Sequence, residues 1–277
     1  MVLFKNLLLK ELCDSYNEVL KKPMEQWVDS TVTQKDIDCF KHEALQDSPF
    51  DTLKLKKQLY DNYLNNKASI FSKLISNARI TVLTDNKNEF YPYKSLCRLF
   101  QWMGKPKNSN IWQIYVFSSK VKRILPDQGS VGPEHLNGGY TYPCRSDCIV
   151  VYRYEEFFRV LVHELLHASC TDNMNNAVEV REAATEMWAE FFLVVLCANG
   201  SFTKTKELWN IQDHHIQDLN YTVRTHHNLV SSDYGARYTT LRETILNNFH
   251  VTLDKSYSPK RIKSSRFTSN KLDSYLV

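Results

Sequence analysis

Apolar residues recur with a helical period through the first part of the chain. Leu3, Leu7, Leu8 and Leu12 follow one another at intervals that predict an amphipathic helix at the start. A second stripe predicts another helix over residues 54–75, and its apolar members are Leu55, Leu59, Tyr60, Tyr63, Leu64 and Ile70. We therefore expect residues 1–76 to form a helical N-terminal region.

The pattern changes after residue 76. Residues 80–83, 111–117 and 148–154 are rich in β-branched and aromatic side chains, which predicts three strands. Residues 129–143, between the last two strands, contain four of the seven glycines and are expected to form a loop.

Helical patterns return after residue 154. Residues 155–170 are apolar around most of a helical circumference, which predicts a buried helix. Other helices are expected at 178–198, which ends before a glycine, and at 204–228 and 234–248. Residues 254–277 are polar and basic and are expected to form a loosely ordered tail. The pattern predicts an α+β fold, mainly helical with a small twisted sheet, and a central domain over 77–253.

Composition narrows the class of protein. The net charge of +4 is mild for 277 residues, so a nucleic-acid partner is not expected. No apolar segment is long enough to span a bilayer, and charged residues interrupt the N-terminal apolar run, so neither a membrane partner nor a signal peptide is expected. The seven cysteines include no CxxC pair. Reduced thiols in an intracellular, cytoplasmic setting are the simplest interpretation, and a disulfide framework is the alternative.

The sequence His163-Glu164-Leu165-Leu166-His167 is an HExxH motif inside the strongest predicted helix. Residues four apart share a helix face, so both imidazoles can reach one metal ion, with Glu164 beside them as a candidate general base. The alternative is a chance string on a core helix. Two ionisable histidines on an apolar helix would then be costly without a purpose.

A zinc site needs a third protein ligand. The pattern HExxHxxGxxH is absent, because Cys170 and Asn173 stand at its glycine and last histidine. Glu186, on the following predicted helix, is separated from His167 by eighteen residues. Glu182 and Glu190 share its helix face and compete with it, either as ligand, as acceptor for an imidazole N–H, or as ordinary exposed acids.

The spacing HExxH-x18-E resembles that of gluzincins, notably the family of membrane alanyl aminopeptidases, whose third ligand lies in a string E-x-x-A-E-[FY]. Glu186, Ala189, Glu190 and Phe191 match this string. The resemblance covers about residues 150–197, and the family's GAMEN motif has no counterpart here. It implies a zincin-like domain with one Zn²⁺ per chain, held by His163, His167 and Glu186. The chain also resembles metallopeptidase-like proteins of large DNA viruses, which implies an intracellular setting.

The gluzincin resemblance also implies a tyrosine or histidine from a later helix that stabilises the oxyanion. Tyr238 is our candidate for this catalytic role, and ordinary packing is the alternative. The competing side chains are His214, His215, His226, His227 and Tyr234.

Residues 137–142 are a candidate for the edge strand on which a zincin binds its peptide substrate by main-chain hydrogen bonds. Gly138 and Gly139 would allow a close backbone approach, and Tyr140 would follow them in the substrate-binding strand. The alternative is a flexible surface loop.

These residues together predict zinc-dependent hydrolysis of peptide bonds in a peptide or protein substrate. A catalytically inactive zincin-like interaction module is the alternative function. The intact Glu164 favours the enzyme. The oligomeric state cannot be inferred from this pattern.

Overall fold

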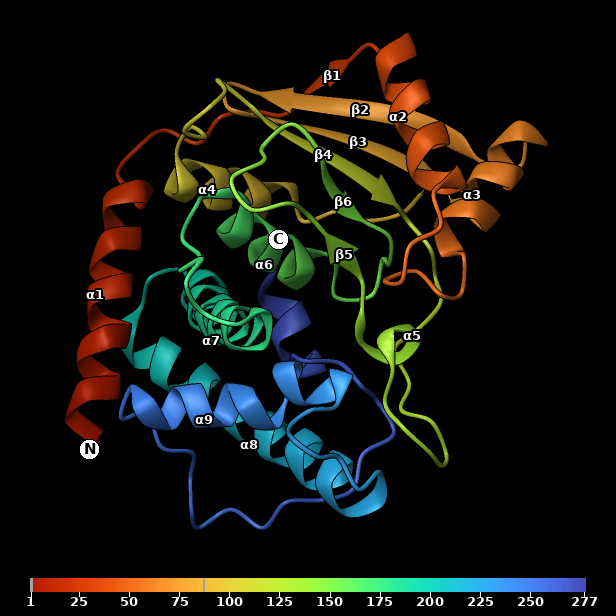
Figure 1. Ribbon diagram of the computed structural model, residues 1–277. Coiled ribbons are helices and arrows are strands. Elements are labelled where there is room, and N and C mark those ends of the chain that lie inside the picture. The colour runs from red at the N-terminus through yellow and green to blue at the C-terminus, as the bar shows by residue number, and fades with distance from the viewer. Residues whose placement is uncertain (1, 87) are drawn as a thin grey trace. The chain divides into compact units, whose positions relative to one another are not determined.

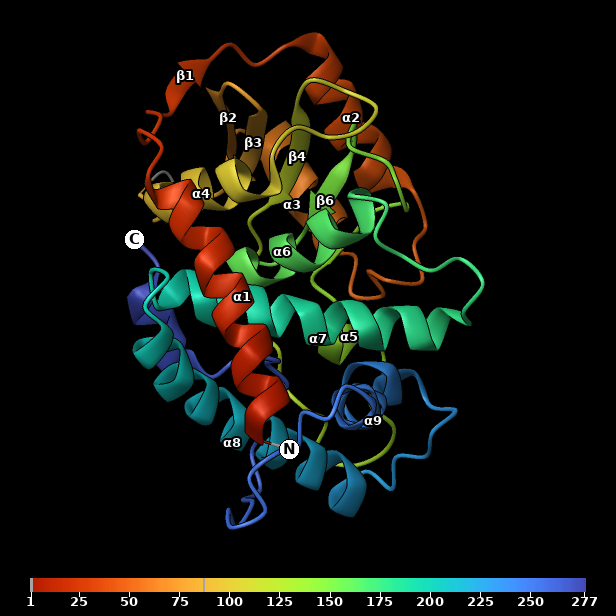
Figure 2. The same cartoon turned by 90° about the vertical axis from the view of Figure 1, so that its left-hand side faces the viewer.

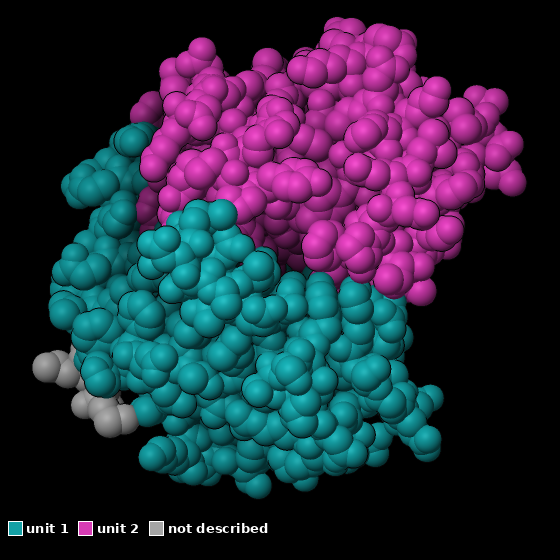
Figure 3. All heavy atoms as spheres, viewed as in Figure 1, with its two compact units in different colours: residues 1–22, 123–136, 172–277 teal, residues 23–122, 137–171 magenta. Residues whose placement is uncertain are grey.

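The computed structural model describes residues 2–86 and 88–277, so Met1 of the expected N-terminal region lies outside the described residues. The chain divides into two compact units that alternate along the sequence (Figure 3). Residues 2–22, 123–136 and 172–277 form one unit, and the described residues of 23–122 and 137–171 form the other. This division differs from the three consecutive regions that the hydrophobic pattern predicts.

The unit that contains residues 137–171 is built on a mixed sheet. Its described strands lie in the order β1-β2-β3-β4-β6-β5. β3, β4 and β6 are parallel neighbours, whereas β5 pairs antiparallel with β6 at the edge. The strand bounds are β1 (Val28–Ser30), β2 (Ser69–Ile75), β3 (Ala78–Thr84), β4 (Trp112–Phe117), β5 (Gly139–Tyr140) and β6 (Ile149–Val151). The three predicted strands are confirmed as β3, β4 and β6.

Helices cover both faces of this sheet. α2 (Gln34–Leu45) and α3 (Leu55–Leu64) lie on one face, and α4 (Tyr93–Met103) and α6 (Phe157–Ala168) on the other (Figure 1). Strand alternation explains the two layers, because Tyr115 and Phe117 of β4 pack against Phe40 of α2 while their neighbours point to the opposite face. The expected α+β fold, with a small sheet packed on the HExxH helix, is confirmed.

The predicted helix over 54–75 is wrong in its second half. The helix α3 ends at Leu64, and residues 69–75 form β2, which pairs antiparallel with β3 along its whole length. Only Ser72 and Ile75 of this segment are buried, so burial alone does not mark it as a strand, and pairing with β3 overrides the apolar spacing. The helix α4 was not predicted, although Leu96, Leu99 and Phe100 have helical spacing.

The other unit is helical in its described part. Figure 2 shows α1 (Val2–Leu20) lying across α7 (Val178–Cys197) and α8 (Phe202–His226). The remaining elements are α5 (Pro133–Leu136), η1 (Tyr234–Tyr238), α9 (Thr240–Asn248) and η2 (Asn270–Tyr275). Predicted helices at 178–198 and 204–228 are confirmed, and that at 234–248 is divided into η1 and α9. No helix within residues 2–86 and 88–277 has the length and apolar character needed to cross a bilayer.

The C-terminal residues 254–277 are packed rather than loosely ordered. Phe267 and Leu272 are buried. The Gln212 side chain of α8 donates to the Phe267 carbonyl and accepts from the Ser269 N–H. Phe267 and Leu272 therefore hold this segment against its own unit, although its composition is mainly polar and basic.

Candidate functional site

The HExxH motif lies in the middle of α6. All twelve residues of this helix are buried, as its apolar pattern predicts. His163, Glu164 and His167 are 6%, 5% and 6% exposed, so three ionisable side chains of the motif are largely withdrawn from water. Burial of such groups is costly unless they have partners.

The two motif imidazoles converge. Their Nε2 atoms are 3.1 Å apart, and the rings meet edge to face with centroids 4.7 Å apart. Zinc–nitrogen bonds of about 2.0–2.1 Å at a tetrahedral angle place two ligand nitrogens about 3.3 Å apart. The separation in α6 is close to this value, so His163 and His167 fit one zinc ion.

The edge strand β5 packs directly on the motif helix. A Cβ atom on Gly139 would lie 2.6 Å from Cγ1 of Val160, 2.8 Å from the Val150 carbonyl oxygen and 3.3 Å from Oε1 of Glu164. Only a residue without a side chain fits this position. Gly139 therefore brings the main chain of β5 beside the Glu164 carboxylate.

The pairing of β5 with β6 fixes the direction of its main-chain groups. The Tyr152 N–H donates to the Gly138 carbonyl at 2.7 Å, and Gly139 is opposite Val151 in the next pair. Hydrogen-bonded and non-hydrogen-bonded pairs alternate in an antiparallel ladder. The N–H and carbonyl of Gly139 therefore point away from β6, whereas the Gly138 carbonyl is already used inside the sheet.

Tyr140 points to the opposite face of the sheet from Gly139. Its hydroxyl accepts a hydrogen bond from Lys56 Nζ at 2.5 Å and donates to the Glu43 carboxylate. Burial and the neighbouring Glu43 raise the pKa of Tyr140, and burial lowers the pKa of Lys56, which is 1% exposed. The expected contribution of Tyr140 to substrate binding is thus limited to its main chain.

The hydrophobic pattern did not predict this largely buried cluster of Glu43, Lys56 and Tyr140. A signal was present in the helical stripe of residues 54–75. Lys56 lies four residues before Tyr60 and seven before Tyr63, on the face that packs inward.

The C-terminal end of α6 is held by a disulfide between Cys144 and Cys170. The N–H groups of both cysteines donate to the His167 carbonyl, at 3.1 and 3.2 Å. The expectation of entirely reduced thiols is therefore wrong for this pair. The five other cysteines, all within the described residues, are free.

The carboxylates of α7 belong to the other unit and differ in their surroundings. Glu190 forms an ion pair with Arg242 of α9 at 2.6 Å, and both side chains are completely buried. Glu186 is 1% exposed. Glu182 is half-buried, and its charge contributes to the raised pKa of Tyr238. The pairing of Glu190 with Arg242 gives it a structural role and leaves Glu186 and Glu182 as candidate ligands.

Tyr238 lies in η1 of the same unit as α7. Its ring stacks on Phe267, and its hydroxyl is 3.2 Å from that of Tyr234. Burial first, and then Glu182, raise the pKa of Tyr238 well above its usual value, so this phenol remains protonated and able to donate. The stacking of Tyr238 on Phe267 is also what ordinary packing, the alternative to a catalytic role, would produce.

The four competing histidines have contacts of their own in this unit. His215 and His227 lie against the carbonyls of Arg266 and Gly129, at 2.8 and 3.0 Å. His214 stacks on Tyr257, and His226 contacts Thr225. These contacts favour structural roles for the histidines.

No protein-family model, curated protein or solved structure matches this chain.

Proposed function

We propose that this protein is a zinc-dependent peptidase. The observation that carries the proposal is the arrangement on α6, where two Nε2 atoms 3.1 Å apart adjoin a carboxylate that faces the edge strand. Two imidazoles that can ligate a metal, a candidate base and a strand for main-chain binding lie within one unit, and together they support metal-assisted peptide hydrolysis.

Glu164 is the proposed general base. Zinc held by His163 and His167 would make the attacking water more acidic. Beside such an ion, Glu164 would be the general base that accepts the proton of the attacking water and passes it to the leaving amine nitrogen. Its burial keeps competing water away and strengthens these interactions.

The third ligand is proposed to be a carboxylate of α7. The eighteen-residue spacing favours Glu186. Glu182, one helical turn earlier on the same helix face, is the competing residue. Tyr238 is the proposed oxyanion donor from the same unit.

The substrate class is a peptide or protein in extended conformation. An added strand would use the N–H and carbonyl of Gly139, which point away from β6. The substrate peptide bond to be cleaved would then lie beside α6, near Glu164.

The first experiment separates metal binding from catalysis in the full-length protein. Native mass spectrometry should find one zinc per chain, and a peptide library should be cleaved. His163→Ala should lose zinc, whereas Glu164→Gln should retain zinc and lose cleavage. His42→Ala, which changes an exposed histidine of α2 in the same unit, is the matched control and should retain both.

Two outcomes would contradict this proposal. A protein that takes up no zinc on titration has no such site. A protein that binds zinc, yet cleaves no member of a broad library, supports the inactive interaction module instead.

An intracellular location is also part of the proposal. Five free cysteines suit a reducing compartment, whereas the Cys144–Cys170 disulfide requires an oxidising step. Alkylation of thiols at the moment of cell lysis, followed by peptide mapping, tests this location. A fully oxidised set of cysteines would exclude it.

A further inference from the structure

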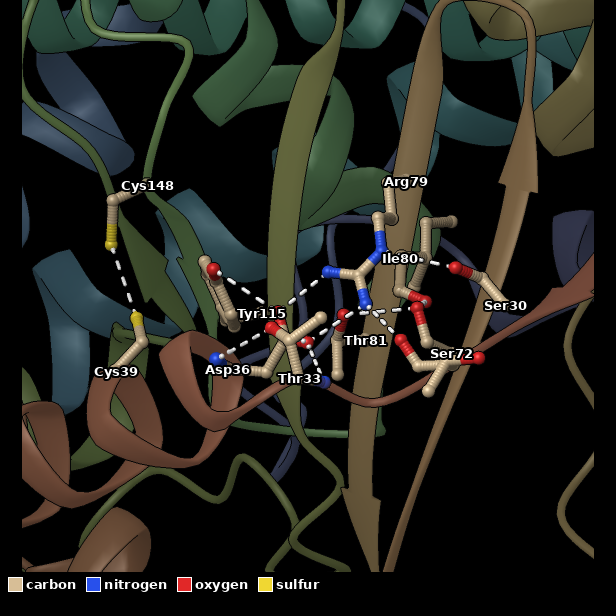
Figure 4. Close-up of polar contacts among 11 residues, drawn as sticks. Ser30, Thr33, Asp36, Cys39, Ser72, Arg79, Ile80, Thr81, Tyr115 and Cys148 are labelled. Atoms are coloured by element: carbon tan, nitrogen blue, oxygen red, sulfur yellow. Dashed lines mark hydrogen bonds and ion pairs between the residues drawn. The ribbon is translucent and has the colours of Figure 1, made fainter.

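The loop between β5 and β6 carries two cysteines, and each lies beside a cysteine from another segment of the same unit. Cys144 is joined to Cys170 at the end of α6. Cys148, four residues later, faces Cys39 of α2, with the two Sγ atoms 4.0 Å apart (Figure 4). Both of these thiols are free and only half-buried.

We propose that Cys39 and Cys148 are an oxidisable pair that forms a second disulfide when the protein meets a low-molecular-weight disulfide. The proposal concerns a modification site in the sheet unit and does not rest on peptidase activity. A disulfide has an S–S length of about 2.05 Å, so the sulfurs must approach by about 2 Å. Rotation of the two side chains would supply this movement, since Cys39 and Cys148 are both only partly buried at the edge of the core.

The chemistry balances with oxidised glutathione as the oxidant. The Cys39 thiolate attacks one sulfur of oxidised glutathione, forms a mixed disulfide and releases one glutathione thiolate. Cys148 then displaces the second glutathione, and the Cys39–Cys148 bond forms. Two protein thiols are oxidised, and one glutathione disulfide is reduced to two thiols.

The surroundings of Cys148 indicate which of the two cysteines reacts first. The hydrogen bond with Cys39, followed by burial, raises the pKa of Cys148, which makes it the slower nucleophile. Its thiol proton has an acceptor nearby, because Cys148 Sγ donates to Glu43 Oε1 at 3.9 Å. Cys148 is therefore the resolving partner once Cys39 carries the mixed disulfide.

The second bond would tether the β5–β6 loop on both sides. Cys144 already ties it to the end of α6, and Cys148 would tie it to α2. Tyr140 of β5 contacts Glu43 on the same α2 helix. Oxidation should thus reduce the motion of the edge strand.

The test uses the folded full-length protein in oxidised glutathione, quenched with acid and digested without reduction. The number of alkylated thiols should fall from five to three, and one cross-linked peptide should contain Cys39 and Cys148. Amide exchange of residues 139–151 should slow in the oxidised form. Cys39→Ser should abolish the cross-link, whereas Cys97→Ser, which changes a fully buried cysteine of the same unit, should retain it.

Three results would overturn the proposal. All five thiols of the protein could remain reduced while an exposed reference thiol in the same solution is fully oxidised. Mixed glutathione adducts could accumulate without an internal bond. Cys148 could instead cross-link to Cys144 or Cys170, which would show exchange with the existing disulfide.

Discussion

At the residue scale, the missing side chain of Gly139 allows β5 to approach α6. The Val160 side chain and the Val150 carbonyl leave no room for a Cβ atom at this position. A carbonyl of the adjacent strand cannot move without breaking the sheet. Gly139 therefore couples the geometry of the edge strand to that of Glu164.

Gly139→Ala should lower both stability and the proposed activity. Overpacking should cost about 1–3 kcal/mol of unfolding free energy. A displacement of about 1 Å near the base should reduce kcat by about 100-fold. Urea unfolding and peptide cleavage measure the two effects.

Gly104→Ala is the control for this substitution. Gly104 has φ 70° and ψ −160°, a conformation that costs other residues about 1–3 kcal/mol. No atom lies within 4 Å of its added Cβ. It should lose similar stability with unchanged kcat, and an equal fall in kcat for both variants would refute the local role of Gly139.

Asp36 is a second residue whose surroundings determine its chemistry. Arg79 Nη1 and Nη2 donate to its two carboxylate oxygens at 2.5 and 2.8 Å, and the Thr33 N–H donates at 2.7 Å (Figure 4). Burial alone would raise the pKa of Asp36, but the hydrogen bonds from Arg79 and Thr33 outweigh it and lower the pKa to about 2. The ionised form is thus strongly favoured in the folded protein.

This depressed pKa predicts the pH dependence of stability. An unfolded aspartate has a pKa of about 3.9, so the contribution of Asp36 is complete above that pH and is lost as the pH falls toward 2. Asp36→Asn should be less stable than the parent at pH 7, and the difference should narrow between about pH 4 and pH 2. Urea midpoints across this range provide the measurement.

Asp61→Asn is the matched control for Asp36. The Asp61 side chain is 47% exposed and pairs with Lys57 on the surface of α3. Its loss should change stability by less than about 1 kcal/mol at any pH. A parent–variant difference for Asp36→Asn that is constant from pH 7 to 2.5 would exclude the assigned pKa.

At the element scale, α6 is fixed at the end where His167 lies. The N–H groups of Cys144 and Cys170 both donate to the His167 carbonyl, and the disulfide connects the donors. These contacts to its main chain orient His167, the proposed zinc ligand. Groups that orient metal ligands typically change metal affinity by about 10–100-fold when removed.

The double variant Cys144→Ala/Cys170→Ala should lose stability and bind zinc more weakly. A bridge between residues 26 apart contributes about 3.5 kcal/mol of unfolding free energy in the chain-entropy account. Zinc affinity should fall at least about tenfold. Reductant should have the same two effects on the parent and none on the double variant. Unchanged zinc affinity would limit the disulfide to a stabilising role.

The elements differed in how much of their structure could be predicted from sequence. α6 was predicted because its apolar period, its length and the HExxH spacing all agree. β2 was missed because its residues satisfy a helical stripe, and only pairing with β3 distinguishes the two structures. The roles of Lys56 and Glu43 arise from contacts between distant segments, which one sequence does not reveal.

At the scale of the whole molecule, the proposed ligands come from separate stretches of the chain. His163 and His167 belong to the unit with residues 137–171, and Glu186 belongs to the unit with residues 172–277. The chain crosses from one unit to the other several times, so each unit is built from segments that are far apart in the sequence. Zinc held by His163 and His167 would stabilise the fold that presents them, because the ion binds these ligands only in the folded state.

Zinc should therefore slow amide hydrogen exchange in α6, and also in α7 because Glu186 is the proposed third ligand. At a free zinc concentration of 100 times the Kd, binding adds about 2.7 kcal/mol, which slows exchange through global opening by about 100-fold. The slowing should appear in α6 and in α7 alike when the chelated and zinc-loaded proteins are compared. Glu186→Ala should weaken zinc binding and confine the remaining protection to α6, whereas Glu182→Ala should behave as the parent. The reverse result for these two variants would move the third ligand by one turn of α7, and protection of α6 alone in the parent would remove α7 from the ligand set.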